Sequence, residues 1–304
     1  MRPINFFKWF LMAALVTLAG ACKAPEATEY LPKFSDLPAA SQEIVYRFGV
    51  HPLHNPQRLS EVFSPLMDYL SEHIPGVQFQ LEASRNYPSY DAKLSRREHH
   101  FSLPNPYQTL QAIKAGYRVF GKMGDDENFR GIILVRRDSG IEQPTDLKGK
   151  AVSYPAPTAL AATMMPQYYL QTHGVDVMGD LDNRYVGSQE SSVMNVFLGQ
   201  TAAASTWPPP WRALKAERPE LAEQLHVIWR TEPLINNGLV VLPEVPEATV
   251  EQVRQLLVNL HTSERGREIL SAMELSRFEA ADNETYAVVE SFLTKFARHV
   301  RPLP

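Results

Sequence analysis

Cysteine is almost absent from this chain, because its 304 residues include only one, Cys22. A single thiol excludes an intramolecular disulfide and any zinc or iron–sulfur site built from several thiolates. Charge of one sign is not in excess either: 30 Lys and Arg stand against 34 Asp and Glu, which gives nucleic-acid binding no electrostatic support. The glycine patterns of phosphate loops and dinucleotide-binding folds are also missing.

Long apolar runs are missing from the rest of the chain, but its start carries a short one. Arg2 and Lys8 precede the apolar run 9–19, and small residues lead up to Cys22. A basic start, a short apolar core and a small-residue cleavage site predict a signal peptide over residues 1–21. The pattern resembles the lipobox of bacterial lipoproteins, which implies lipid chains on Cys22 and a membrane tether. A plain secretory signal with a free thiol, or an uncleaved anchor, is the alternative.

Residues 22–43 are predicted to form a flexible tether, because Pro25, Pro32 and Pro38 stand there among Glu, Ala, Ser and Lys. From Ile44 onward, strand and helix patterns alternate along the chain. This alternation predicts an α/β fold with parallel sheets that are covered by helices. The remaining length suits one barrel or two smaller α/β lobes, and periodicity alone leaves both open.

Local signals predict where several helices begin and end. Asn55–Pro56 and Asn105–Pro106 each supply an N-cap followed by a first-turn proline. A further helix is expected from about Thr158 to His173. Gly116 and Gly174 are expected to end the helices before them.

Several segments together resemble the phosphate, phosphite and phosphonate substrate-binding proteins of ABC importers. These segments are Phe48–Val50 with the helix after it, Tyr90–Leu94, Leu103–Tyr107, Asp146–Val152 and Val186–Ser188. The resemblance implies a bilobal type II periplasmic-binding-protein fold, with two α/β lobes joined by a two-crossover hinge. Lobe I would comprise residues 44–130 plus 237–304, and lobe II residues 131–236. It also implies a cleft that closes on a ligand, an ABC permease as partner, and neither cofactor nor catalysis.

In this fold the ligand lies outside the carboxyl ends of the strands, where strand-to-helix loops converge. That rule places the following residues at the cleft: His51, Tyr87, Tyr90, Asn105, Tyr107, Ser153, Tyr154, Thr158, Ser188, Gln189, Glu190, Thr206 and Trp207. The loop that ends at Thr158 meets a helix N-terminus, which favours an anion. The alternative is that Thr158 only caps the helix. The family has a Ser- and Thr-rich tract here, whereas Ala159, Leu160 and Ala161 follow in this chain.

Aromatic residues are expected around the same cleft. Trp207 and Trp211 flank three prolines that are predicted to form a rigid polyproline stretch, and tyrosines face them from the other lobe. Aromatic walls suit a planar or cationic organic ligand, while simple packing of both indoles at the lobe's rim is the alternative. Glu190 either meets a cation or favours a helix N-terminus. A phosphonate-like anion and an aromatic or cationic solute therefore both remain open as ligands.

A metal site is not expected. His51, His54, His99 and His100 offer imidazoles, but His99 and His100 are strand neighbours that point to opposite faces.

Three functions compete. The leading hypothesis is a monomeric, lipid-anchored solute-binding protein that captures a small polar ligand for an ABC importer. A ligand-sensing periplasmic lipoprotein that acts with a membrane sensor kinase would use the same fold. A cleft-based hydrolase is the third, although no nucleophile and base stand in a recognisable context.

Overall fold

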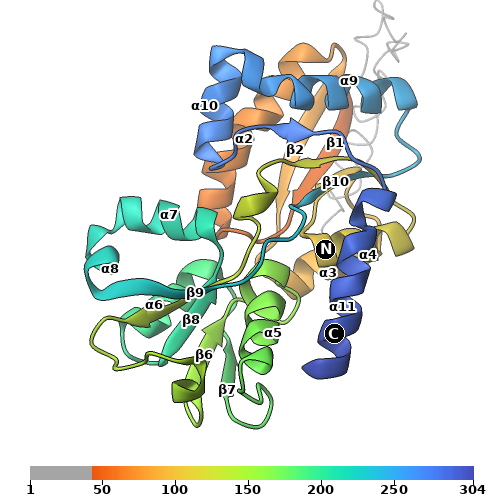
Figure 1. Ribbon diagram of the computed structural model, residues 1–304. Coiled ribbons are helices and arrows are strands. Elements are labelled where there is room, and N and C mark those ends of the chain that lie inside the picture. The colour runs from red at the N-terminus through yellow and green to blue at the C-terminus, as the bar shows by residue number, and fades with distance from the viewer. Residues whose placement is uncertain (1–42) are drawn as a thin grey trace, which may run out of the picture. The chain divides into compact units, whose positions relative to one another are not determined.

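The computed structural model describes residues 43–304. The predicted signal peptide, Cys22 and nearly all of the predicted tether lie outside the described residues. Residues 43–304 form two β-sheets, each with its own helices (Figure 1). Among these residues, no helix combines the length and the apolar character that a membrane span requires.

The first sheet contains six strands in the order β11-β4-β10-β3-β1-β2. Their bounds are β1 Ile44–Val50, β2 Val77–Ala83, β3 Phe101–Leu103, β4 Arg118–Met123, β10 Gly238–Val241 and β11 Phe278–Glu279. β1 runs parallel to β2 and β3, with Phe48 opposite Phe101. β10 lies antiparallel between β3 and β4, so a strand from late in the chain completes the centre of this sheet.

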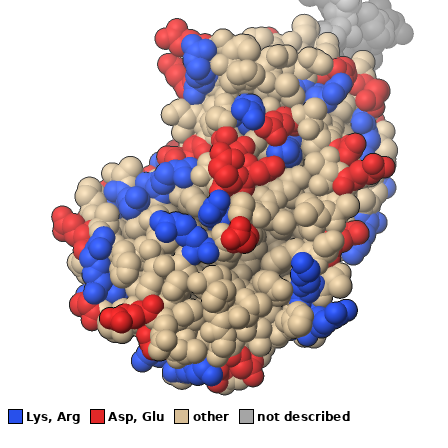
Figure 2. Space-filling model, viewed as in Figure 1, with Lys and Arg blue, Asp and Glu red and all other residues tan. Residues whose placement is uncertain are grey.

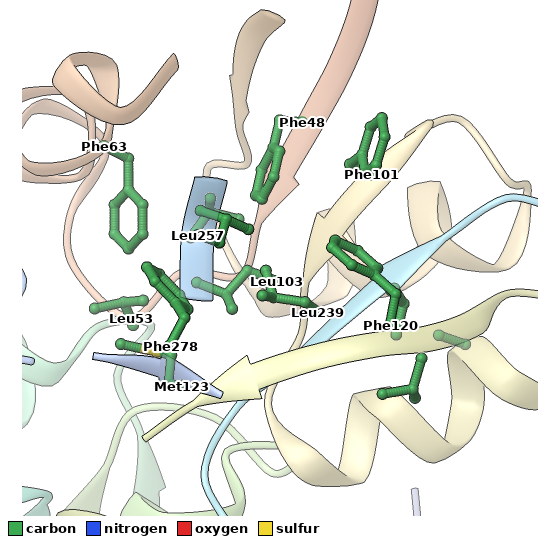
Figure 3. Close-up of a cluster of buried hydrophobic side chains, with 14 of the residues drawn as sticks. Phe48, Leu53, Phe63, Phe101, Leu103, Phe120, Met123, Leu239, Leu257 and Phe278 are labelled. Carbon is green, nitrogen blue, oxygen red and sulfur yellow. The ribbon is translucent and has the colours of Figure 1, made fainter. Parts of the chain in front are cut away.

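Helices pack on the first sheet through one large apolar core. They are α2 Pro56–His73, α3 Tyr87–Ser95, α4 Pro106–Lys114, α9 Glu247–Val258, α10 Glu264–Ala272 and α11 Ala287–His299. Figure 3 shows Phe48, Phe101 and Phe120 from three strands together with Leu257 of α9. The rings of Phe48 and Phe101 stack at 6.2 Å. Each such buried ring contributes about 2–3 kcal/mol of hydrophobic free energy.

The second sheet contains five strands in the order β7-β6-β8-β5-β9. Its strands are β5 Ile132–Arg136, β6 Ala151–Tyr154, β7 Asp182–Tyr185, β8 Ala203–Thr206 and β9 Leu225–Arg230. Its helical elements are the π-helical turn η3 Leu160–Met164, α5 Met165–Thr172, α6 Gln189–Phe197, α7 Pro208–Glu217 and α8 Pro219–Gln224. Two smaller apolar clusters, one on each face, hold this sheet to its helices.

The chain crosses from the first sheet to the second between β4 and β5, and it returns between β9 and β10. The fold is therefore bilobal, and a single barrel is excluded for residues 43–304. The expectation of parallel sheets is wrong in part, because β5, β10 and β11 each run antiparallel to their neighbours. β5 and β10 follow a crossover rather than a helix of their own sheet, so they enter from the opposite end, whereas β11 is a two-residue edge strand that follows α10.

Local rules succeeded at two of the predicted helix starts and failed at two other segments. Asn55 caps α2 and Asn105 caps α4, each followed by proline as predicted. The Trp207–Trp211 segment is not a polyproline stretch, because its prolines form the first turn of α7, where their missing N–H groups need no partner. Thr158 does not cap the next helix either; Ala159 stands at that position and the helix opens as η3.

Candidate ligand-binding site

A small cavity lies where strands of both sheets lead into their helices. It is lined by His51, Tyr87, Asn105, Phe129, Ala159, Leu160, Ala161, Ala162, Gln189, Trp207 and Asn237. His51 follows β1 directly, and Trp207 follows β8 directly. Each lobe therefore contributes a residue that lies at the carboxyl end of a strand. The free volume is about 10 Å³, which is close to the room needed by one water molecule.

Helix N-termini converge on this cavity. Tyr87 and Gln189 are the first residues of α3 and α6, Asn105 and Trp207 are the N-cap residues of α4 and α7, and Leu160 opens η3. The positive ends of these helix dipoles therefore point towards one volume. Among residues 43–304, no Asp, Glu, Lys or Arg side chain lines the cavity, so no carboxylate of this part of the chain opposes the dipoles there.

The η3 turn brings backbone donors that have no acceptor within the helix to the cavity wall. The N–H groups of Thr163 and Met164 both donate to the carbonyl of Ala159. The preceding N–H groups, those of Leu160, Ala161 and Ala162, begin the helix and have no acceptor within it. Small side chains on two of these residues let a ligand approach the backbone closely. This surface can donate hydrogen bonds to an oxyanion.

His51 is buried in a single tautomer. Its Nδ1 lies 2.8 Å from the carbonyl oxygen of Leu103, which can only accept, so Nδ1 carries the proton and Nε2 is an acceptor. Burial lowers the pKa of His51 to about 4, although the bond to Leu103 opposes that change. The imidazole is therefore neutral at pH 7.

Gln189 is oriented by its neighbours. The hydroxyl of Thr206 donates to its Oε1 at 2.7 Å, so the amide nitrogen faces the other way as a donor. That nitrogen lies 3.4 Å from the hydroxyl of Tyr87, which comes from the first-sheet lobe. Burial raises the pKa of Tyr87, so its phenol stays protonated. Gln189 and Tyr87 thus offer neutral donors from the two lobes at neighbouring points of the cavity wall.

Thr158 joins the two lobes beside the cavity rather than lining it. The Asn105 amide donates to its carbonyl oxygen at 3.0 Å, and its hydroxyl donates to Asp91 at 3.2 Å. Gln108 donates to the other oxygen of Asp91 at 2.6 Å. Burial raises the pKa of Asp91, and the two hydrogen bonds offset that rise in part.

The other predicted site residues lie further from the cavity. Tyr90 bonds to Ser102, and Tyr107 bonds to the carbonyl oxygen of Pro304. Ser153 bonds to the backbone of α6, Tyr154 is fully buried beside Tyr185, and Ser188 caps α6. Glu190 accepts from the backbone N–H of Asn55 across the lobes at 3.2 Å, which adds a further polar link between them.

The two indoles that looked equivalent in the sequence occupy different environments. Trp207 lies in the cavity wall with its ring 5.6 Å from that of Phe129. Trp211 packs in a core cluster of the second sheet with Ile132 and Leu134. The predicted pair of indoles around the ligand is therefore wrong for Trp211, because the first turn of α7 directs it to the core.

Sequence reasoning missed two polar or aromatic members of the wall. Phe129 and Asn237 come from the two crossovers, and the buried Oδ1 of Asn237 accepts no hydrogen bond from any residue that the structure describes. Neither follows the end of a parallel strand, so the rule used for the other residues could not find them. Their only sequence signal is a position beside the implied hinge.

Charged side chains lie outside the cavity, and some link α7 to the first-sheet lobe. Figure 2 shows Lys and Arg gathered over α7 and β9, close to a group of Asp and Glu. Arg58 pairs with Glu217, and Arg212 with Glu274, each at 2.6 Å. Exposed pairs of this kind contribute about 0–1 kcal/mol each. Within residues 43–304 no three His, Cys, Asp or Glu side chains gather to hold a metal ion.

The family model for the periplasmic substrate-binding protein of phosphonate ABC transporters matches residues 48–286. The chain belongs to this family. Among curated relatives, the phosphonates-binding periplasmic protein of Escherichia coli is 19% identical over 253 residues, which cover 81% of this chain and 75% of that protein.

Solved structures of similar proteins share the fold of this family member. A binding protein component of a phosphonate ABC transporter from Pseudomonas aeruginosa has a TM-score of 0.76 at 18% identity, with 83% of this chain and 87% of that chain covered. PhnD1 from Prochlorococcus marinus, in complex with methylphosphonate, has a TM-score of 0.77 at 17% identity, with 84% and 98% covered. At such identities the comparison establishes the bilobal architecture. The identity of the ligand has to be argued from the residues of the site.

Proposed function

We propose that this protein captures a small phosphonate-class anion between its two lobes and delivers it, chemically unchanged, to an ABC importer in the periplasm. One observation carries the proposal: helix N-termini and neutral donors from both lobes converge on a cavity to which residues 43–304 contribute no Asp, Glu, Lys or Arg side chain. Such a site replaces the water around an oxyanion by fixed dipoles. The methylphosphonate complex of PhnD1 supports the choice of ligand.

The ligand enters by separation of the lobes, because about 10 Å³ admits no phosphonate. Residues 44–130 plus 237–304 and residues 131–236 would move as two bodies about the two crossovers. The bonds from Asn105 to Thr158 and from Asn55 to Glu190 break on opening and form again on closure.

The finer parts of the proposal concern the membrane side. Lipid chains on Cys22 hold the protein to a membrane, residues 22–43 act as the tether, and the monomer docks on a permease. Replacing Cys22 by Ser tests the first point. Labelled fatty acid should be incorporated into the wild type and not into the variant, and equal incorporation contradicts lipidation at this residue.

Ligand binding is tested on the full-length protein in mild detergent by thermal unfolding and calorimetry. The probes are methylphosphonate, phosphite, phosphate, methanesulfonate and benzylammonium. Methylphosphonate at a hundred times its dissociation constant should stabilise the fold by about 2.7 kcal/mol.

Matched charge variants locate the site. Gln189→Glu places a carboxylate in the cavity wall and should abolish the methylphosphonate effect, whereas Gln200→Glu, an exposed change on the same lobe, should keep it. No stabilisation by any phosphorus oxyanion refutes the proposal. A response to benzylammonium alone would select the aromatic or cationic ligand class instead.

A further inference from the structure

The segment after α11 lies across both lobes. α11 packs in the core of the first-sheet lobe and runs beside α5 of the second (Figure 1). Val300 contacts the apolar clusters of both sheets. Further along, the carbonyl oxygen of Pro304 accepts a hydrogen bond from Tyr107 of α4 at 2.7 Å.

Arg301 makes the polar part of this bridge. Its guanidinium lies 5.0 Å from the ring of Phe296 on α11. From there it donates to the carbonyl oxygen of Pro157 at 2.9 Å and to the side-chain oxygen of Gln167 at 3.1 Å. Both acceptors belong to the second-sheet lobe. No ion pair joins Arg301 to a carboxylate within residues 43–304, so carbonyl oxygens alone hold its charge.

Pro157 lies three residues before Leu160, the first of the residues that bring backbone donors to the cavity. Three groups of the first-sheet lobe hold this short stretch: Arg301 binds Pro157, while Asn105 and Asp91 bind Thr158. The next residue, Ala159, is the N-cap of η3. A shift of Pro157 therefore moves the N–H groups at the cavity wall.

We propose that Arg301 is a positioning residue for the ligand. It holds the Pro157–Thr158 stretch against the first-sheet lobe in the closed state, and it thereby sets the place of the η3 donors. The inference rests on the proposed function. The hydrogen bonds from Arg301 to Pro157 and Gln167 cross between the lobes, so they break on opening. Their loss should therefore act mainly on the dissociation rate of a bound ligand.

The test compares Arg301→Ala and Arg301→Lys with Arg298→Ala, which removes the same charge from an exposed position on the same helix end. Stopped-flow tryptophan fluorescence gives methylphosphonate association and dissociation rates. Two charge-assisted hydrogen bonds predict a dissociation rate about tenfold higher in Arg301→Ala, with association changed less than about twofold. Arg301→Lys, which retains the charge and one bond, should be intermediate, and Arg298→Ala should match the wild type.

A purely structural role gives a different pattern. The thermal midpoint of unliganded Arg301→Ala would fall, and its dissociation rate would stay at the wild-type value. That result overturns the inference. An equal rise of the dissociation rate in Arg298→Ala also overturns the inference, because the effect would then come from the loss of one positive charge rather than from the contacts of Arg301.

A second measurement separates failure of this inference from failure of the proposed function. Cys22→Ser with Glu61→Cys on α2 and Glu223→Cys on α8 places one spin label on each lobe at exposed positions. Without ligand, Arg301→Ala should widen and lengthen the interlabel distance distribution relative to Arg298→Ala. If no phosphorus oxyanion binds the wild type, the proposed function fails, while this measurement still tests whether Arg301 holds the two lobes together. Identical distance distributions in Arg301→Ala and Arg298→Ala overturn the inference.

Discussion

His51 should make the protein less stable as the pH falls from 6.5 towards 4. Burial lowers its pKa from 6.5 to about 4 in the folded state. Between these values the unfolded chain binds a proton on His51 that the folded chain does not. Protonation therefore favours unfolding, and the free energy of unfolding falls by about 1.4 kcal/mol for each pH unit in this window. At pH 5, which is 1.5 units below the unfolded value, the loss is about 2 kcal/mol.

His51→Asn isolates this effect, because the Asn amide can still donate to the carbonyl of Leu103 without titrating. Urea unfolding at pH 7.5 and pH 5.0 should show the variant gaining about 2 kcal/mol relative to the wild type at the lower pH. His99 also has its pKa lowered to about 4, chiefly by burial, but it is present in both proteins and cancels in the difference.

The matched control is His261→Asn on the exposed surface, which should follow the wild type at both pH values. If the stability difference between His51→Asn and the wild type is the same at pH 7.5 and pH 5.0, the argument for a buried neutral imidazole fails.

Three further substitutions separate effects on stability from effects on ligand binding. In Gly131→Ala the new methyl group would lie 2.5 Å from Pro166 and 2.6 Å from the carbonyl oxygen of Ala161. The free energy of unfolding measured in urea should therefore fall by about 1–3 kcal/mol, and calorimetry should show weaker methylphosphonate binding. Phe101→Ala should cost about 3–5 kcal/mol in urea unfolding and leave the affinity of the folded protein within about twofold, because its fully buried ring lies in the first-sheet core. Tyr87→Phe should change the free energy of unfolding by less than about 1 kcal/mol but weaken methylphosphonate binding about fivefold in calorimetry. An unchanged affinity would show that the Tyr87 hydroxyl does not contact the ligand.

Part of the site was predictable because it follows from position along the chain. His51, Asn105 and Trp207 each come within two residues of a strand's carboxyl end, and the cavity forms there. Asn105 also illustrates why caps are readable from sequence: its partner Gln108 is three residues away, so the whole capping box is local. Phe129 and Asn237 were not predictable, since they lie on crossovers whose place at the cavity depends on how the lobes meet.

The local elements and the α/β class could be read from the sequence, because they depend on periodicity and on contacts a few residues apart. The bilobal plan came from the family resemblance, since periodicity left a single barrel open. Which of several chemically similar side chains serve the site depends on tertiary packing. Trp207 and Trp211 stand four positions apart, and the packing of α7 sends one to the cavity and the other to a core. Arg301 and Pro157 meet across 144 positions, a contact that exists only because two folded lobes close on each other.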